Sequence, residues 1–407
     1  MTPKIRLLHV TEDHSIQNTG ITSALDTLLR QLARKQDTIQ LSLISTGGES
    51  IPTPVGVSAI TLNPSGLGHN WRYASGSQSS LLQAVKQADV IHLHGIWMWI
   101  QWAAARAACE RGKPFVLSVH GMLEPWIWRR QKWPHQLKKY LYWHLIAYPA
   151  FRHASWIHAV NSTEAETLTK YFKNMDRRGD DIKIGVIPHS LDLEAIDLIL
   201  QKINSHYSRS PNVVLPDTFL QQNDPYILFL GRLHPVKGID QLIQAFAQLD
   251  APRVKLKIAG FSEAREAAYG EYLRKLVTDA GLKERVQFLG AVQDDRKWEL
   301  LHNAWVFCLP SHSEVIGMVN LEAAACRTPV ITTHATGLGA DWTKNGGVLV
   351  ESESAAIARA LTQALHWSVN ERMERGSALR SLIETTYSWN ATSKSWVSLY
   401  ERLGATI

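Results

Sequence analysis

The chain has 407 residues, of which 45% are hydrophobic and 20% charged, so it is long enough for two or three domains and lacks the composition of a disordered protein. Three cysteines without a C-x-x-C spacing argue against a disulfide framework or a zinc knuckle and are interpreted as buried thiols in a reducing cytosol. The N-terminus shows no signal-peptide pattern and no apolar run is long enough to span a bilayer, which predicts a cytoplasmic protein.

The net charge of +6 is concentrated in one basic, aromatic segment. Residues 125–163 contain no Asp or Glu, and basic residues alternate there with Trp and Tyr. This composition suits an anionic, amphipathic surface such as a lipid headgroup layer, so peripheral contact with the inner face of the cytoplasmic membrane is one hypothesis. The alternative, given equal weight, is that half of the aromatic residues are core and the charges form a solvated helix face. Nucleic acid is not expected as a partner, because no recognition module accompanies the basic residues.

Short β-branched runs alternate with stretches of helical period in both halves of the chain. Strands are predicted at residues 5–10, 41–45, 90–93, 115–119, 156–160 and 184–187, and again at 226–230, 254–259, 286–289, 306–309, 329–332 and 347–350. Pro, Asn and Ser interrupt the pattern between residues 200 and 224. The chain is therefore predicted to form two Rossmann-like α/β domains, residues 1–200 and 225–386, joined by a linker at 201–224.

The loops after the strands are the expected place for ligands, because parallel sheets bind them beyond the carboxyl ends of their strands. The strand at 226–230 runs into Gly231 and Arg232, and Lys237 follows five residues later. Glycine lets the backbone approach a ligand, and the two cations can grip a diphosphate and balance a leaving group that gains negative charge. Taken alone, the same residues would equally fit a surface turn with a solvated Arg and Lys.

Two glutamates, Glu314 and Glu322, follow the strand at 306–309, and a helix is predicted to begin near Gly317. The N-terminal amides and positive dipole end of such a helix favour a phosphate. If the step between the glutamates were wholly helical, the carboxylates would be roughly 12 Å apart, beyond the separation of a glycosidase pair. The separation suits one carboxylate on the sugar and the other on the ribose of a nucleotide-sugar.

Together these residues resemble a known family, the retaining GT-B glycosyltransferases of family GT4. The resemblance rests on Gly231–Gly238, Ile258–Gly260, Val286–Gly290, Leu309–Ser311 with Glu314 and Glu322, and Thr328–Val330. It implies two Rossmann-like domains facing across a cleft, and a final helix at 387–407 that crosses back onto the N-terminal domain.

The resemblance also implies roles for individual residues of the C-terminal domain. Arg232 and Lys237 would bind the donor diphosphate, Glu314 the transferred sugar and Glu322 the ribose. Gly231 and the backbone amides of Ile316, Gly317, Met318 and Val319 would complete the phosphate and sugar site, and the loop ending at Val292 would face the base. Arg327 stands where the family usually has glycine; if that position needs a positive φ, Arg327 costs about 1 kcal/mol.

The N-terminal domain resembles the family more loosely. Ser118–Leu123 looks like the family's histidine loop, so His120 is expected to reach the donor sugar across the cleft. A lone histidine is more often structural, but its place at a strand end before Gly121 favours a functional role. Gly20 resembles the glycine of the loop after the first strand, which approaches the phosphates. His94, Trp97 and Trp126 are assigned to the acceptor side.

The predicted activity is transfer of a hexose, with retention, from a nucleoside-diphosphate sugar to a saccharide or lipid-linked saccharide in polysaccharide biosynthesis. UDP-glucose or a similar UDP-hexose is favoured as donor, and GDP-mannose is possible. No Asp-x-Asp sequence is present to hold a divalent cation, so neither a metal nor another cofactor is expected. The alternatives are a GT-B sugar-nucleotide epimerase or hydrolase, and a non-catalytic module that binds nucleotide-sugars or membrane surfaces.

Overall fold

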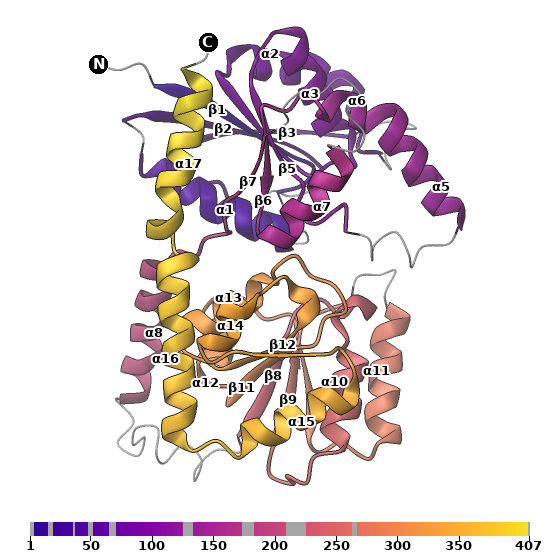
Figure 1. The fold of residues 1–407 in the computed structure, drawn as a ribbon, viewed down its shortest axis with the longest axis vertical. Helices are drawn as coiled ribbons and strands as arrows, with labels where there is room; N and C mark the ends of the chain where they lie inside the picture. Colours follow the sequence, from indigo (N-terminus) through magenta and orange to yellow (C-terminus); the bar gives the residue numbers. More distant parts are fainter. Residues whose placement is uncertain are drawn as a thin grey trace. The chain divides into compact units, whose positions relative to one another are not determined.

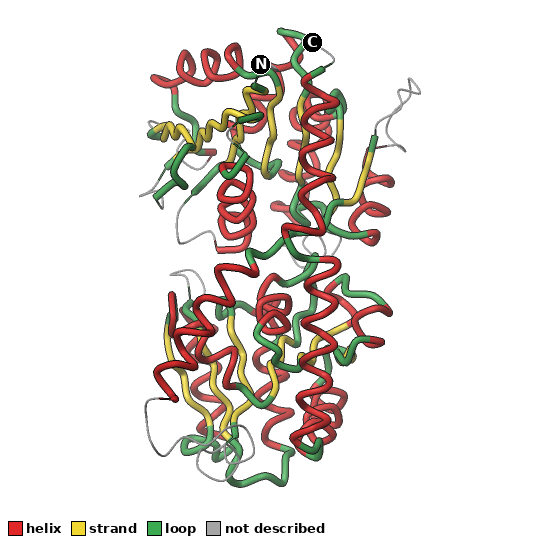
Figure 2. Tube along the Cα trace, turned by 90° about the vertical axis from the view of Figure 1, so that its left-hand side faces the viewer, coloured by secondary structure: helices red, strands yellow, loops and turns green. Residues whose placement is uncertain are grey.

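The protein is described by a computed structural model, which covers residues 4–14, 19–35, 37–47, 52–64, 71–124, 133–172, 183–208, 225–262 and 267–405. The chain forms two compact units (Figure 1). The first unit contains Met1–Ser190 and Thr392–Ile407, and the second contains Leu191–Ala391. In each unit the strands are flanked by helices (Figure 2). The two Rossmann-like α/β domains predicted from the sequence are thus confirmed.

The first unit holds a seven-stranded parallel sheet in the order β3-β2-β1-β4-β5-β6-β7. Its strands are β1 (Ile5–Thr11), β2 (Ile39–Thr46), β3 (Val57–Leu62), β4 (Val90–His94), β5 (Phe115–Ser118), β6 (Trp156–Ala159) and β7 (Ile184–Val186). Its helices include α1 (Thr19–Ala33), α2 (Gln78–Gln87), α3 (Trp99–Glu110), α5 (Trp133–Tyr142), α6 (Tyr148–Phe151) and α7 (Ser162–Phe172), with a π-helical segment at Trp143–Ala147 between α5 and α6.

The two faces of this sheet differ in chemistry because side chains alternate along each strand. On one face, Leu93 and Phe115 belong to a large apolar core that also contains Trp99 of α3 and Phe151 of α6. The other face carries polar residues at the intervening positions. The strand register places His9 opposite His92, His94 opposite Ser118, and Ser118 opposite His158. The sheet thereby gathers these side chains at the carboxyl ends of four strands.

The second unit holds a six-stranded parallel sheet in the order β10-β9-β8-β11-β12-β13. Its strands are β8 (Tyr226–Leu230), β9 (Lys255–Ala259), β10 (Val286–Gly290), β11 (Val306–Leu309), β12 (Val330–Thr333) and β13 (Val348–Val350). Its helices include α8 (Leu193–Ser208), α10 (Ile239–Ala247), α11 (Ala267–Asp279), α12 (Asp294–Asn303), α13 (Met318–Ala325), α14 (Ala340–Lys344), α15 (Ser354–Leu365) and α16 (Val369–Thr386).

The final helix, α17 (Trp389–Gly404), returns the chain to the first unit, as predicted. The hydroxyl of Tyr400 lies 2.9 Å from His92 Nδ1, and Gly404 lies against Ile5. Trp396 and Tyr400 are buried there. The expectation that the two units face each other across a cleft stays a prediction.

Three expectations differ from the structure. The edge strand β3 was not predicted, because its central side chains are exposed and therefore lack an apolar pattern. The expected linker at 201–224 begins inside α8, which continues to Ser208, and the units divide at Ser190 rather than at residue 200. Residues 209–224 lie outside the described part. Cys308 and Cys326 are buried, but Cys109 near the end of α3 is exposed, so the expectation of three buried thiols is wrong for Cys109.

Candidate active site

The loop after β8 contains one position, Gly238, whose backbone conformation and surroundings only glycine fits. A short 3₁₀ turn at Pro235–Lys237 ends in Gly238, whose φ of 64° is left-handed. A Cβ at Gly238 would collide with the carbonyl of Pro310, so this loop packs directly against the loop that follows β11. The amide of Leu233 donates to Phe261 O over 2.9 Å, which ties the loop to the end of β9 as well. Arg232 is half-buried in it.

This packing brings Lys237 and Glu314 together. Their side chains form an ion pair and are 17% and 16% exposed. The hydroxyl of Ser311 donates to Glu314 Oε1 over 3.1 Å, and the Glu314 amide donates to Ala335 O over 2.9 Å. The ammonium and the carboxylate are both largely removed from solvent. The ammonium can bind a phosphate oxygen, and the carboxylate can bind a sugar hydroxyl beside it.

Helix α13 begins at Met318, and its N-cap Gly317 has a left-handed φ of 64°. Glu314 therefore lies in a loop, and the separation predicted for a continuous helix does not apply. Ile316 is buried, whereas Met318 and Val319 are half-buried in the first turn. The first amides of a helix lack intrahelical acceptors, so this turn offers donors to an anion.

Glu322 lies within α13, and its side chain is only 5% exposed. Its Oε1 accepts a 2.6 Å hydrogen bond from Lys297 Nζ on α12, and its Oε2 is buried without a partner. A hydroxyl pair of a ribose would satisfy such a carboxylate oxygen. Lys297 was not predicted as a site residue, because its partner is distant in the sequence and nothing in the local pattern distinguishes it from a surface lysine.

The remaining predicted residues are placed as follows. Val292 is half-buried in the loop between β10 and α12, and Gly20 is exposed in the first turn of α1. A Cβ at Gly20 would meet no atom within 4 Å, so no close approach within the described chain requires glycine there. Trp97 packs against the core of the first unit, with Lys139 Nζ 5.2 Å from its ring centroid. Trp126 lies outside the described residues.

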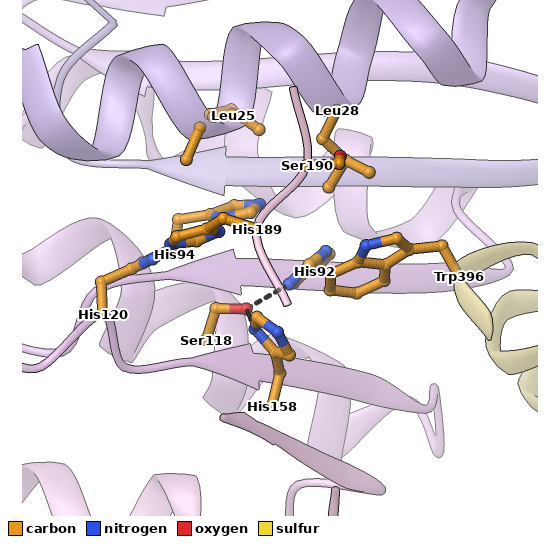
Figure 3. Close-up of a pocket in the computed structure, with 11 residues that line it drawn as sticks. Leu25, Leu28, His92, His94, Ser118, His120, His158, His189, Ser190 and Trp396 are labelled. Atoms are coloured by element: carbon orange, nitrogen blue, oxygen red, sulfur yellow. Dashed lines mark hydrogen bonds between the residues drawn. The ribbon is translucent and has the colours of Figure 1, made fainter. Parts of the chain in front are cut away.

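The first unit contains a small cavity lined mainly by polar side chains from several strand ends (Figure 3). Helix α1 contributes apolar residues and α17 contributes Trp396. The lining consists of Ala24, Leu25, Leu28, His92, His94, Ser118, His120, His158, His189, Ser190 and Trp396. His120 follows β5, and His189 stacks on it with ring centroids 5.5 Å apart. Apart from imidazoles, these described lining residues include no ionisable side chain.

One chain of hydrogen bonds in this cluster has a fixed direction. His158 Nε2 lies 2.7 Å from the carbonyl of Ile187, which can only accept, so Nε2 carries the proton. Neutral His158 then accepts at Nδ1 from the hydroxyl of Ser118, over 2.7 Å. Ser118 in turn accepts from His92 Nε2 over 2.7 Å, which leaves His92 Nδ1 to accept from the hydroxyl of Tyr400. A single carbonyl thus sets the tautomers of two histidines.

A second chain contains the predicted catalytic histidine. His120 Nε2 lies 3.1 Å from His94 Nδ1, and His94 Nε2 lies 3.0 Å from His9 Nδ1. The outer atoms, His120 Nδ1 and His9 Nε2, are buried and have no partner. Both ring nitrogens of His120 are therefore occupied or buried, and His94 belongs to a buried chain. Contact of His120 with a donor sugar and the acceptor role of His94 stay predictions.

Burial keeps these histidines neutral. It lowers the pKa of His9 and His189 to about 3 and that of His158 to about 4. It also holds the pKa values of His92, His94 and His120 well below 6.5, and neighbouring imidazoles lower them further. The cluster is therefore a set of neutral donors and acceptors at physiological pH. Of its members, the sequence pointed to His94 and His120 at strand ends, without indicating that they join one cluster.

In the described part of the chain, one group of side chains could hold a metal ion: His9, His92 and His94. One nitrogen of each lies within 4.8 Å of the others. Neutral imidazole is a good ligand for zinc or nickel. The directed chain already uses both nitrogens of His92, however, so an ion there would have to displace Tyr400 or Ser118. The geometry favours the hydrogen-bonded arrangement.

Comparison with known proteins agrees with this fold. Residues 215–380 match the family described as Glycosyl transferases group 1, and residues 19–195 match Glycosyltransferase Family 4. A D-inositol 3-phosphate glycosyltransferase of Jonesia denitrificans is 31% identical over 230 residues, which are 55% of this chain and 52% of that protein. The chain thus spans about half the length of this relative. An uncharacterized glycosyltransferase of Methanocaldococcus jannaschii is 29% identical over 78% of this chain and 76% of its own.

Solved structures share the fold at low identity. HepE of Anabaena, in complex with UDP and glucose, has a TM-score of 0.72 and 17% identity, covering 98% of this chain and 99% of that one. Sucrose-phosphate synthase of Thermosynechococcus elongatus has a TM-score of 0.73 and 18% identity, covering 99% and 100%. Two parallel-sheet Rossmann-like units, two family matches and glycosyltransferase relatives lead to one conclusion: the chain belongs to the GT-B glycosyltransferases of family GT4.

Proposed function

We propose that this protein transfers a hexose from a UDP-hexose, with retention of configuration, to a saccharide or lipid-linked saccharide. The observation that carries the proposal is the pairing of Lys237 with Glu314 beside the N-terminus of α13. This arrangement offers a cation, a carboxylate and backbone donors to one nucleotide-sugar. HepE, which shares the fold, binds UDP-glucose, and this favours a UDP-sugar as donor.

The chemistry follows from the charge that develops as the glycosidic bond breaks. The leaving UDP gains negative charge, and preorganised cations and amides stabilise the transition state more than the ground state. Lys237, Arg232 and the first turn of α13 would supply this stabilisation. They would do so without a divalent cation, so metal-independent transfer is part of the proposal.

Retention is proposed to follow the front-face route, in which the leaving phosphate helps to remove the acceptor proton. A double-displacement route would need a carboxylate nucleophile near the anomeric carbon. The carboxylate proposed to bind the sugar, Glu314, is paired with Lys237, and no carboxylate is among the described residues that line the cavity at His120. His120 would contribute as a neutral hydrogen-bonding group once the donor is bound.

Replacing Arg232 tests the donor site. Arg232→Ala should lower the turnover of UDP-hexose by about 100-fold, because one charge-stabilising group is lost from the transition state. Arg359→Ala, which removes an exposed arginine on α15, serves as the matched control and should leave turnover unchanged. An Arg232→Ala protein with nearly full turnover would contradict the proposal.

We further propose that α5 contacts an anionic membrane surface and thereby favours a lipid-linked acceptor. No residue of α5 is buried, and Trp133 and Tyr140 are 73% and 54% exposed. Lys138 and Lys139 lie between these aromatic residues, and the helix contains no acidic residue. Among the described helices, none has the length and apolar composition needed to cross a bilayer. Aromatic rings and lysines on one exposed helix are typical of interfacial binding.

Vesicle binding tests this contact. The protein should sediment with vesicles that contain anionic phospholipid, less so at high salt, and Lys138→Glu should weaken the binding. Lys275→Glu, on the exposed side of α11, makes the same charge change outside α5 and should have little effect. Equal loss in both variants, or no binding by the unmodified protein, would contradict the proposal.

A further inference from the structure

A buried glutamate connects the loop of His120 to the neighbouring strand end. Glu164 lies in the first turn of α7, and only 2% of it is exposed. Its Oε1 accepts a 2.7 Å hydrogen bond from the amide of Gly121, and its Oε2 accepts a 2.7 Å hydrogen bond from the amide of Val160. One carboxylate thus binds the backbone after β5 and the backbone after β6.

The backbone that Glu164 binds has an unfavourable conformation. His120 and Gly121 are both left-handed, with φ values of 54° and 72°. A positive φ is uncommon for residues other than glycine, although histidine adopts it more often than most. The loop's other backbone bonds include those from Met122 to Val119 and from Glu124 to Gly121, over 3.3 and 3.0 Å. The 2.7 Å bond from the Gly121 amide to the Glu164 carboxyl links the turn to α7.

Helix capping accounts for only one oxygen of this carboxylate. In a capping box, the residue three positions after the cap bonds back to the amide of the cap residue. Here Asn161 Oδ1 accepts from the Glu164 amide over 2.8 Å, and Glu164 Oε2 accepts from Val160, the residue directly before the cap, but Oε1 bonds to Gly121 in a different loop. Burial raises the pKa of Glu164 to about 7, against the lowering effect of the two amide bonds, and Glu124 raises it further. A carboxylate is therefore costly at this position, and its bond to Gly121 lies outside the helix.

We propose that Glu164 is a positioning residue, which holds the left-handed turn at His120 and so fixes the imidazole for the reaction. The inference rests on the proposed function, because it gives His120 a part in transfer. Glu164 acts through the backbone of Gly121, and its effect on turnover should therefore depend on the His120 side chain.

A double-mutant cycle tests this dependence. UDP-glucose hydrolysis and UDP binding are measured for the full chain, Glu164→Gln, His120→Ala and the double variant. Glutamine keeps the size of the side chain but offers only one acceptor oxygen, so one amide loses its partner. Glu166→Gln, on the exposed side of the same helix, is the matched control. If Glu164→Gln does not fold, Glu164→Asp, which keeps the charge and shortens the reach, takes its place in the cycle.

The expected result is a loss of kcat of about 10- to 100-fold in Glu164→Gln, with UDP affinity unchanged. In the His120→Ala background the same substitution should change kcat less than about two-fold, because residues that act as a unit are not additive. The same fold-loss in both backgrounds would overturn the inference, since it would show a general structural effect. A harmless His120→Ala would also overturn it, while the donor site would still be judged by Arg232→Ala.

Discussion

The two units present their polar groups in opposite ways. In the second unit, charged side chains are paired and partly exposed: Lys237 with Glu314, and Lys297 with Glu322. In the first unit, the groups around the cavity are neutral imidazoles and hydroxyls, and several are completely buried. Charged side chains suit the recognition of a diphosphate. Neutral imidazoles and hydroxyls suit the binding of hydroxyl groups, and each nitrogen keeps a fixed role as donor or acceptor. The comparison predicts that the two units respond differently to pH and to substitution.

The largest expected effect is acid destabilisation of the first unit. The pKa of His9 and His189 is lowered to about 3, and that of His158 to about 4, whereas an unfolded chain titrates near pH 6.5. Below pH 6.5 the unfolded state therefore binds more protons. The stability that neutral burial provides is complete above pH 6.5 and is lost as pH falls towards 4. These three histidines should contribute on the order of 4 kcal/mol per pH unit.

Hydrogen exchange at pH 7, 6 and 5, corrected for intrinsic rates, measures this difference within one molecule. Peptides from β1, β4 and β6 should lose protection before peptides from β9 and β11. Burial also lowers the pKa of His302 in the second unit, which gives that unit a smaller dependence of the same sign. Simultaneous loss of protection in both units would contradict the account.

The second expected effect is on turnover. Lys237→Ala should lower the turnover of UDP-hexose by about 100- to 1000-fold, because it removes a cation next to the leaving group and leaves Glu314 unpaired. Steady-state rates measure the loss, and Lys275→Ala on α11 is the control. Unchanged turnover in Lys237→Ala would show that the charged pair does not contact the donor.

A smaller effect tests the direction of the imidazole chain. Ser118→Ala should lower the free energy of unfolding by about 1–3 kcal/mol, because it leaves both His92 Nε2–H and His158 Nδ1 buried without a hydrogen-bond partner. Tyr400→Phe should cost less, since it removes only the terminal donor to His92. Urea unfolding of both variants gives the comparison. A larger loss of unfolding free energy in Tyr400→Phe would mean that the hydrogen bonds do not run in the direction described.

The smallest effect concerns Arg327, which is exposed and has a left-handed φ of 60°. Arg327→Gly should raise the free energy of unfolding by at most about 1 kcal/mol, because glycine adopts this conformation without strain. A thermal melt detects the change. A lower melting temperature would show that the arginine side chain contributes more than the backbone costs.

The same contrast explains what the sequence could predict. The residues of the second unit lie in short contiguous stretches after β8 and β11, so their types and spacing indicated the candidate site. The positive φ that Arg327 would need if it replaces the family's glycine is observed. The cluster of the first unit comes from β1, β4, β5, β6, the loop after β7 and α17. The sheet register brings the four strands together, and α17 and the loop after β7 join them through tertiary packing.

Single residues that act across segments were missed for the same reason. Lys297 reaches Glu322 from another helix, and Glu164 reaches Gly121 across 43 positions of sequence. A lysine or glutamate on an amphipathic helix carries no local sign of such a partner. His120 was singled out, but the pattern at His120 gives no sign of its hydrogen bond to His94, which continues to His9.

The most direct test of the central claim is nucleotide release from a panel of UDP- and GDP-sugars in the presence of EDTA, with Glu314→Ala alongside. The account predicts slow release of UDP from one UDP-hexose, unaffected by EDTA and lost in Glu314→Ala. Release that requires a divalent cation, or that persists in Glu314→Ala, would contradict a metal-independent transferase whose donor site contains Lys237 and Glu314.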